Sequence, residues 1–251
     1  MVAGCPFRVY VAKMARPLRL TCDGAVYHMT ARGIERGRLF QGDQDRVRYL
    51  FYPAESQHLY DVRLYLFGMM TNHVHLVLET PRGNISQFMQ RFHTAYTVWF
   101  NRRRQRSGHL FEGRFGASLV TEDEYILKLS RYVHLNPVFV SAYVDKTKRE
   151  RLLRLRSYVW SSYSSYAGQS VPLDYVTDGP VLAMMDRRKK KQRLIYRRFV
   201  ESGIRDRQEK TQTFGCPIAP HLWPLLNRQS LTVARYTSGL AQSARPNPRH
   251  T

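Results

Sequence analysis

Residues 62–78 read Val-Arg-Leu-Tyr-Leu-Phe-Gly-Met-Met-Thr-Asn-His-Val-His-Leu-Val-Leu. They contain two apolar runs, Val62–Met70 and His73–Leu78, separated by the polar pair Thr71-Asn72. Runs of this length on either side of a two-residue break are typical of neighbouring antiparallel strands joined by a tight turn. Turn-forming residues follow at Pro81-Arg-Gly-Asn84. The sequence therefore predicts an antiparallel strand pair here.

A predicted strand and helix precede this strand pair, and a second predicted helix follows it. Upstream, residues 25–31 predict a strand, and Asp43 is a suitable N-cap for a helix that follows it. Downstream, residues 85–100 carry a broad apolar stripe and predict a helix facing the core. The apolar positions at helical spacing are Val47, Leu50, Phe51 and Ala54 upstream, and Ile85, Phe88, Met89, Phe92, Tyr96, Trp99 and Phe100 downstream.

A further helix is predicted from Thr121, which forms a capping box with Glu124, to about Leu135. Pro137 is expected to stop it. The order of elements is then strand, helix, strand, strand, helix and helix. This order predicts an α+β protein with a ferredoxin-like sandwich, in which helices lie on one face of an antiparallel sheet.

Beyond residue 150 the pattern is less regular. An aromatic, serine-rich segment contains Tyr158, Trp160, Tyr163 and Tyr166, and residues 179–203 predict a strongly basic helix. The expected division is an N-terminal extension that need not be native (1–13), a catalytic domain (14–150), an aromatic and basic helical C-terminal extension (151–227) and a flexible tail (228–251).

The composition points to a polyanionic partner. Forty Lys and Arg against nineteen Asp and Glu give a formal net charge of +21, spread along the whole chain. Nucleic acid would relieve this self-repulsion, whereas a membrane surface is less well matched. Charge alone indicates binding and not chemistry. The three cysteines form no C-x-x-C pair, and no signal peptide or membrane span is apparent, so we expect a cytoplasmic protein.

Two pairs of residues carry candidate chemistry. His73 and His75 alternate along a strand, so both imidazoles lie on one face and can hold one divalent ion. Such a pair alone is more often two half-exposed histidines. Tyr132 and Asn136 are four residues apart, on one face of a helix. Beside Mg²⁺ or Mn²⁺ a tyrosine becomes a workable nucleophile toward a phosphodiester, and an Asn carbonyl can complete the metal site.

Two basic loops are candidates for binding DNA. One follows the first predicted strand, and the other, at residues 101–115, combines glycine, arginine and phenylalanine in a way suited to phosphates and unstacked bases. A solvated surface loop is the alternative. The candidate DNA contacts are Arg32, Arg36, Arg38, Arg102, Arg103, Arg104, His109 and Arg114.

The string Asn72-His-Val-His-Leu76, followed by Glu79-Thr-Pro81, resembles the HUH element of the IS200-like transposases, where U is a bulky apolar residue. The similarity is closer to the branch called REP-associated tyrosine transposases and covers about residues 14–170. Gly68-Met-Met-Thr71 departs from the usual Met-Pro before the histidines. The other matching strings are Met14-Ala-Arg-Pro17, Thr30-Ala-Arg-Gly33 with Glu35-Arg36, Tyr96 with Phe100-Asn-Arg-Arg103, Gly108-His-Leu-Phe111, Gly113-Arg-Phe115, Ser130-Arg-Tyr-Val-His-Leu-Asn-Pro-Val138 and Trp160-Ser-Ser-Tyr163.

This resemblance implies a metal-dependent endonuclease and strand transferase acting on single-stranded or hairpin DNA, with REP-type palindromic repeats of bacterial genomes as the substrate. It implies His73, His75 and Asn136 as metal ligands and Tyr132 as the nucleophile that forms a 5′-phosphotyrosine intermediate. It leaves open whether the protein works as a monomer or a homodimer.

Two other functions remain open from the sequence. One is a nucleic-acid-binding module without catalysis, because a ferredoxin-like sheet with aromatic residues is also how many RNA-binding proteins are built. The other is an HUH replication initiator or relaxase, which would use the same residues on a different DNA substrate.

Overall fold

The computed structural model describes residues 21–120, 123–143 and 145–204. The sheet has the strand order β2-β3-β1-β4, and every pair of neighbours is antiparallel. This confirms the predicted α+β, antiparallel architecture. The elements that build it are β1 (Ala25–Arg32), α1 (Asp43–Tyr60), β2 (Arg63–Met69), β3 (His73–Thr80), α2 (Ile85–Arg103), β4 (Gly116–Val120) and α3 (Asp123–Phe139).

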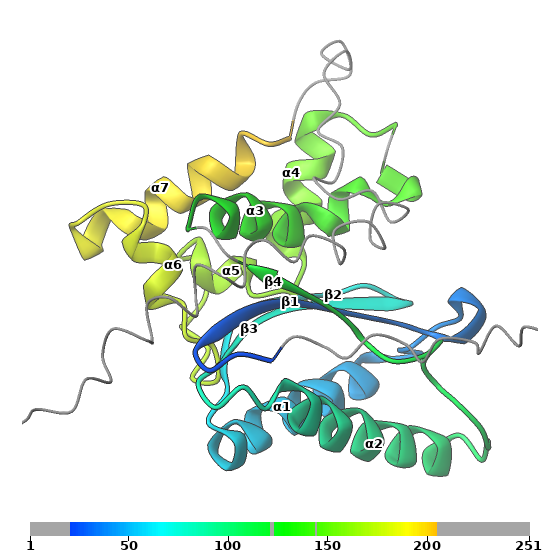
Figure 1. Cartoon of the computed structure of the whole chain (residues 1–251). Helices are drawn as coiled ribbons and strands as arrows, with labels where there is room; N and C mark the ends of the chain where they lie inside the picture. The colour runs from blue at the N-terminus through cyan, green and yellow to red at the C-terminus, as the bar shows by residue number, and fades with distance from the viewer. Residues whose placement is uncertain (1–20, 121–122, 144, 205–251) are drawn as a thin grey trace, which may run out of the picture. The chain divides into compact units, whose positions relative to one another are not determined.

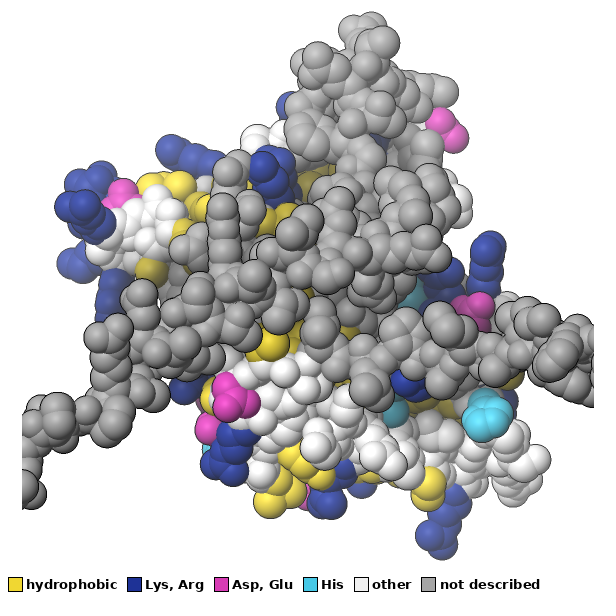
Figure 2. All heavy atoms as spheres, viewed as in Figure 1, with side chains coloured by type: hydrophobic (Ala, Val, Ile, Leu, Met, Phe, Trp, Pro, Cys, Tyr) yellow, Lys and Arg dark blue, Asp and Glu magenta, His cyan; other side chains and the backbone are white. Residues whose placement is uncertain are grey.

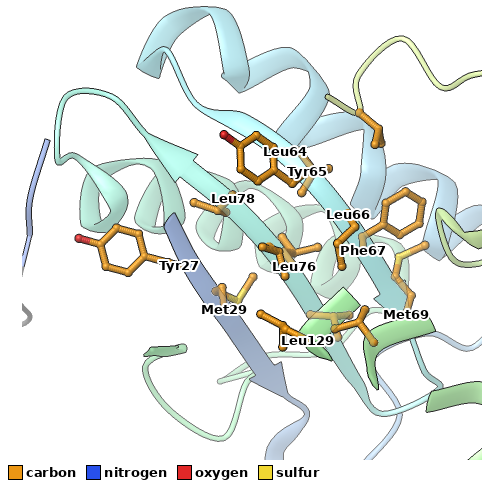
Figure 3. Close-up of a cluster of buried hydrophobic side chains, with 14 of the residues drawn as sticks. Tyr27, Met29, Leu64, Tyr65, Leu66, Phe67, Met69, Leu76, Leu78 and Leu129 are labelled. Carbon is orange, nitrogen blue, oxygen red and sulfur yellow. The ribbon is translucent and has the colours of Figure 1, made fainter. Parts of the chain in front are cut away.

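Helices lie on both faces of the sheet (Figure 1). The helices α1 and α2 cover one face and α3 lies against the other, whereas the sequence predicted helices on one face only. The reason is that β2 and β3 are apolar on both sides: Val74 and Leu76 on one face of β3 and Val77 on the other are all fully buried. Strands with two apolar faces need cover on both. Figure 3 shows side chains of β1, β2 and β3 within this core.

The C-terminal helices complete the second layer. They are α4 (Lys148–Ser157), α5 (Tyr163–Tyr166), α6 (Gly179–Ala183) and α7 (Lys189–Glu201). Their segment also covers the edge of β2, because Met69 N–H donates to the Trp160 carbonyl (2.9 Å) and Thr177 N–H donates to the Leu64 carbonyl (2.7 Å). Residues of this segment therefore share one core with the sheet.

Three local expectations differ from the structure. The prediction of one basic helix over 179–203 is wrong, because this segment forms two helices, α6 and α7. Between them the Asp186 carboxylate accepts the Arg188 N–H (2.7 Å), a local hydrogen bond that competes with helical pairing. The predicted stop at Pro137 is also wrong, since α3 continues to Phe139 and buries Val138 completely. The strand β4 was not predicted, because Gly116-Ala-Ser is a weak strand signal.

The helix predicted from Asp43 is present as α1, but only part of its predicted apolar stripe faces the core: Leu50 packs against it, whereas Val47 and Phe51 do not. Val47 is 60% exposed and Phe51 is 46% exposed, whereas the ring of Tyr49 is buried against Phe92 and Tyr96. The fully buried Asp45 carboxylate accepts the Gln41 and Gly42 N–H groups, which sets the start of the helix. Capping and aromatic packing thus outweigh the periodic pattern.

Some predictions fall outside the described residues. These include the N-terminal extension at 1–13, the matching string Met14-Ala-Arg-Pro17 and the capping-box threonine at position 121. Residues 205–227 of the predicted C-terminal extension and the tail at 228–251 also lie outside the described residues. Among the residues that are described, no helix combines the length and the apolar character needed to cross a membrane.

A buried hydrogen-bond network joins α3 to the C-terminal helices. The fully buried His134 contacts Ser162 Oγ through Nε2 (2.8 Å) and Tyr196 Oη through Nδ1 (2.7 Å). Ser162 Oγ also accepts the Phe67 N–H of β2 (3.0 Å). Burial lowers the pKa of His134 to about 3, so the imidazole is neutral and can donate from one nitrogen and accept at the other. The network fixes α3 over the sheet.

Replacing His134 by alanine should lower the free energy of unfolding by about 3 kcal/mol, because it opens a cavity and leaves the buried hydroxyls of Ser162 and Tyr196 without this partner. Urea unfolding followed by circular dichroism measures the change. His58→Ala, at an exposed position on α1, is the matched control and should change stability by less than about 0.5 kcal/mol. Equal midpoints for the two variants would contradict the structural role of the network.

Candidate active site between β3 and α3

The candidate site lies where α3 crosses the face of β3. In the β1–β3 register Thr30 pairs with His75 and Arg32 pairs with His73, so these side chains share one face of the sheet. Gly68 of β2 pairs with His75 on the same face. A Cβ at Gly68 would lie 3.1 Å from the Val133 carbonyl oxygen, so glycine permits the close approach of α3 to the sheet.

The close approach brings together His73, His75, Tyr132 and Asn136, hereafter the site cluster. His75 Nε2 lies 3.2 Å from Asn136 Nδ2, and the two histidine rings have centroids 5.2 Å apart. The ring of Tyr132 stands edge-on to that of His75, with centroids 5.5 Å apart. His75 and Asn136, which are 61 positions apart in the sequence, are therefore in direct contact.

Each histidine of the site cluster has a second partner at Nδ1. His73 Nδ1 lies 2.8 Å from Asn72 Oδ1, an oxygen that only accepts, so His73 carries its proton on Nδ1. The amide nitrogen of Asn72 donates to the Arg36 carbonyl (3.0 Å), which ties the strand to the preceding loop. His75 Nδ1 lies 2.9 Å from Nε2 of His28 on β1. These contacts leave both Nε2 atoms available on the side of Asn136.

Burial makes the three imidazoles neutral. Desolvation is the main cause that lowers the pKa of His73, with the positive charge of Arg32 as a further cause. Desolvation also lowers the pKa of His75 well below its usual value, and that of His28 to about 4. A neutral imidazole is the form that binds a metal ion.

The site cluster fits an octahedral divalent ion. Ligands about 2.1 Å from such an ion lie about 3.0 Å apart at adjacent positions, close to the 3.2 Å between His75 Nε2 and the Asn136 amide. The same amide also hydrogen-bonds His73, and rotating it by a half turn would present its oxygen to both rings. Within the described ranges no group of three His, Cys, Asp or Glu is arranged to hold a metal. The site cluster offers only two such residues, its third candidate ligand being an amide.

The sequence did not single out His28. It lies on the same face of β1 as Thr30 and Arg32, because residues two apart on a strand share a face. The available signal was a histidine that shares the polar face of its strand with Thr30 and Arg32. Its position beside the site cluster depends on the β1–β3 register, which the sequence pattern does not specify.

Five of the eight predicted DNA contacts lie in, or directly before, two loops that meet at the His73 end of the sheet. Gly33 N–H donates to the Asn72 carbonyl (2.9 Å), Ile34 N–H to the Leu110 carbonyl (3.0 Å) and Glu112 N–H to the Arg32 carbonyl (2.9 Å). These bonds hold the two basic loops side by side next to the site cluster. The exposed side chains concerned are Arg32, Arg36, Arg38, His109 and Arg114.

The basic residues at the end of α2 have different surroundings. Arg104 donates to the buried carboxylate of Asp45 (2.9 Å), which joins α2 to the start of α1. Arg103 donates to Gln44 and lies over the ring of Trp99, whereas Arg102 is exposed. Lys and Arg side chains also lie over several other elements on the face of the molecule that Figure 2 shows. The guanidinium of Arg104 is thus already engaged within the fold.

Comparison with known proteins adds a family to this geometry. A family model described as IS200-like transposase matches residues 21–136. The chain is similar in structure to a REP-associated tyrosine transposase bound to a REP hairpin, with a TM-score of 0.51, 12% sequence identity, and coverage of 62% of this chain and 87% of that one. A candidate transposase from Deinococcus radiodurans R1 is also similar, with a TM-score of 0.34, 17% identity, and coverage of 49% and 95%.

None of the curated proteins compared with the chain matches it. At 12% identity the likeness to the REP-associated transposase shows a shared fold alone, whereas the family model matches the sequence itself. The matched residues include the whole site cluster, the strand β3 that carries the HUH-like string, and the neighbouring strand β2. The family model therefore shows that residues 21–136, a little under half of the chain, are similar to the IS200-like transposase domain.

Proposed function

We propose that this protein is a metal-dependent endonuclease and strand transferase that acts on single-stranded or hairpin DNA through Tyr132. The observation that carries the proposal is the site cluster: a tyrosine from α3 stands edge-on to a histidine whose Nε2 lies 3.2 Å from Asn136, on the same helix as the tyrosine. A binding module without catalysis would not need these four residues in contact.

His73, His75 and Asn136 would hold Mg²⁺ or Mn²⁺, and the bound ion supplies charge neutralisation for the scissile phosphate. The Tyr132 oxygen forms a bond to phosphorus and the bond from phosphorus to the 3′ oxygen breaks. The phenolic proton passes to solvent, and the leaving 3′ oxygen takes up a proton from solvent. The products are a 5′-phosphotyrosine and a free 3′-hydroxyl. Because the new phosphodiester retains the energy of the old one, a 3′-hydroxyl can reverse the step and join strands without a nucleotide cofactor.

Hairpin DNA with REP-type palindromes is the proposed substrate. The formal charge of +21 favours a polyanion, and the exposed basic loops lie next to the site cluster. The structurally similar REP-associated transposase is bound to a REP hairpin. A replication initiator or relaxase would use the same chemistry on a plasmid origin, so the substrate separates these functions.

The proposal is tested with 3′-end-labelled hairpin DNA carrying flanking single strands, incubated with the protein and Mn²⁺. We expect a labelled protein–DNA species that survives denaturing electrophoresis, and its loss when EDTA is added. An origin-type DNA without a hairpin serves as the comparison substrate. A complex seen only on native gels, with or without Mn²⁺, would refute the enzymatic function and indicate a binding module.

The double change Arg36→Ala and Arg38→Ala should weaken DNA binding and lower the salt dependence of log K by roughly 1.4 to 1.8, because each lost phosphate contact removes about 0.7 to 0.9 from the slope. Fluorescence anisotropy at several salt concentrations measures both effects. Arg63→Ala is the matched control: this exposed arginine pairs with Glu79 at the other end of β3. An unchanged slope in the double variant would exclude this loop from the DNA interface.

A further inference from the structure

We propose that His28 is a positioning residue that orients His75 for metal binding by accepting a hydrogen bond from the His75 Nδ1–H. This inference rests on the proposed function, because it concerns the ion that the site cluster would hold. His28 itself lies outside the site cluster, on β1, and contacts the candidate ligand rather than the ion.

The contact between the two rings is direct and buried. His28 Nε2 and His75 Nδ1 are 2.9 Å apart, and the rings are nearly parallel, with centroids 5.2 Å apart. His28 is 8% exposed and His75 is 6% exposed. Water therefore has little access to either nitrogen, and each imidazole depends on the other for this hydrogen bond.

A hydrogen bond between two neutral imidazoles needs one donor and one acceptor, and the choice decides what His75 can do. If His75 donates from Nδ1, its Nε2 carries a lone pair directed toward Asn136. If His28 donates instead, the proton of His75 moves to Nε2 and blocks the position where a metal would bind. His28 must therefore accept at Nε2 in the metal-binding form, with its own proton on Nδ1.

A second observation supports this role. The other candidate ligand, His73, has an acceptor at the same ring position, Asn72 Oδ1 at 2.8 Å. Two different residues, on different elements, thus satisfy Nδ1 of the two histidines and leave Nε2 of each for a ligand. A partner of this kind behind a metal-binding histidine fixes both its tautomer and its ring orientation.

The neighbours of His28 explain how it is held in place. In register it lies between Val77 on β3 and Ser118 on β4, and the ring of Tyr132 stands edge-on to it at 6.4 Å. An apolar side chain would fill this space at a lower desolvation cost than an imidazole. The imidazole at this position is therefore better explained by what it does for His75 than by packing.

The test measures Mn²⁺ binding to the full-length protein without DNA, by isothermal titration calorimetry and by the loss of the electron paramagnetic resonance signal of free Mn²⁺. His28→Leu removes the acceptor and should weaken Mn²⁺ binding by about 10- to 100-fold. His28→Gln places a side-chain oxygen close to the original Nε2 and should stay within about threefold of the wild type, a rescue that a purely packing role would not produce.

Met29→Leu is the matched control, because Met29 is fully buried on the opposite face of the same strand. It should leave Mn²⁺ affinity unchanged. If His28→Leu does not fold, as judged by circular dichroism, the comparison of His28→Gln with His28→Asn replaces it. The shorter asparagine does not reach His75, so only the glutamine variant should retain affinity.

The outcomes separate this inference from the proposed function. Equal Mn²⁺ affinity in the wild type, His28→Leu and His28→Asn would overturn the role of His28 while leaving the metal site intact. Absence of Mn²⁺ binding by the wild-type protein, both alone and with hairpin DNA, would overturn the metal site and the role of His28 together.

Discussion

Replacing Tyr132 by phenylalanine should abolish the covalent protein–DNA adduct and lower cleavage by at least about 10⁴-fold, as expected when a nucleophile is removed. The change deletes one oxygen and keeps the ring, which packs edge-on against His75 with centroids 5.5 Å apart. The fold, the proposed metal ligands and the basic loops should all be retained. We therefore expect hairpin affinity to stay within about threefold, a change of less than about 0.7 kcal/mol.

The matched control is Tyr125→Phe, which removes the same oxygen from another partly buried tyrosine of α3. This variant should form the adduct at the wild-type rate. Protease digestion of the wild-type adduct followed by mass spectrometry should place the DNA on the peptide that contains Tyr132. Adduct formation by Tyr132→Phe, or DNA attached to a different tyrosine, would show that Tyr132 is not the nucleophile.

Replacing His75 by alanine should lower Mn²⁺-dependent cleavage by about 10³-fold, because losing a ligand removes several kcal/mol of charge stabilisation at the scissile phosphate. His75 is central to the site cluster, since its Nε2 faces Asn136 and its Nδ1 faces His28. Calorimetry should show a parallel loss of Mn²⁺ affinity. Hairpin binding in EDTA should be retained, because the basic loops are not altered.

His58→Ala, on the exposed surface of α1, is the control for removing a histidine, and it should leave both Mn²⁺ binding and cleavage unchanged. A thermal melt of His75→Ala is needed beside the activity assay, because the side chain is buried. A folded His75→Ala variant that still cleaves hairpin DNA at the wild-type rate with Mn²⁺ would exclude His75 as a metal ligand.

Much of the fold could be predicted from periodicity. The strands β1, β2 and β3 and the helix α2 lie within a few residues of their predicted bounds, because burial of one or two faces imposes a repeat that the chain displays locally. The failures have physical causes. On α1, capping by Asp45 and packing of Tyr49 turn Val47 and Phe51 toward solvent. On α3, burial of Val138 outweighs the hydrogen bond lost at Pro137.

The sequence by itself determined which side chains share a face within one element: His73 with His75 on β3, and Tyr132 with Asn136 on α3. Alternation along a strand and the four-residue spacing of a helix are local properties of the backbone. The tertiary structure alone decided that these two faces meet, through the glycine at position 68 that lets α3 approach the sheet. It also placed His28 behind His75 and drew Arg104 onto Asp45. Contacts between distant elements arise from packing of the whole core, which no local repeat encodes.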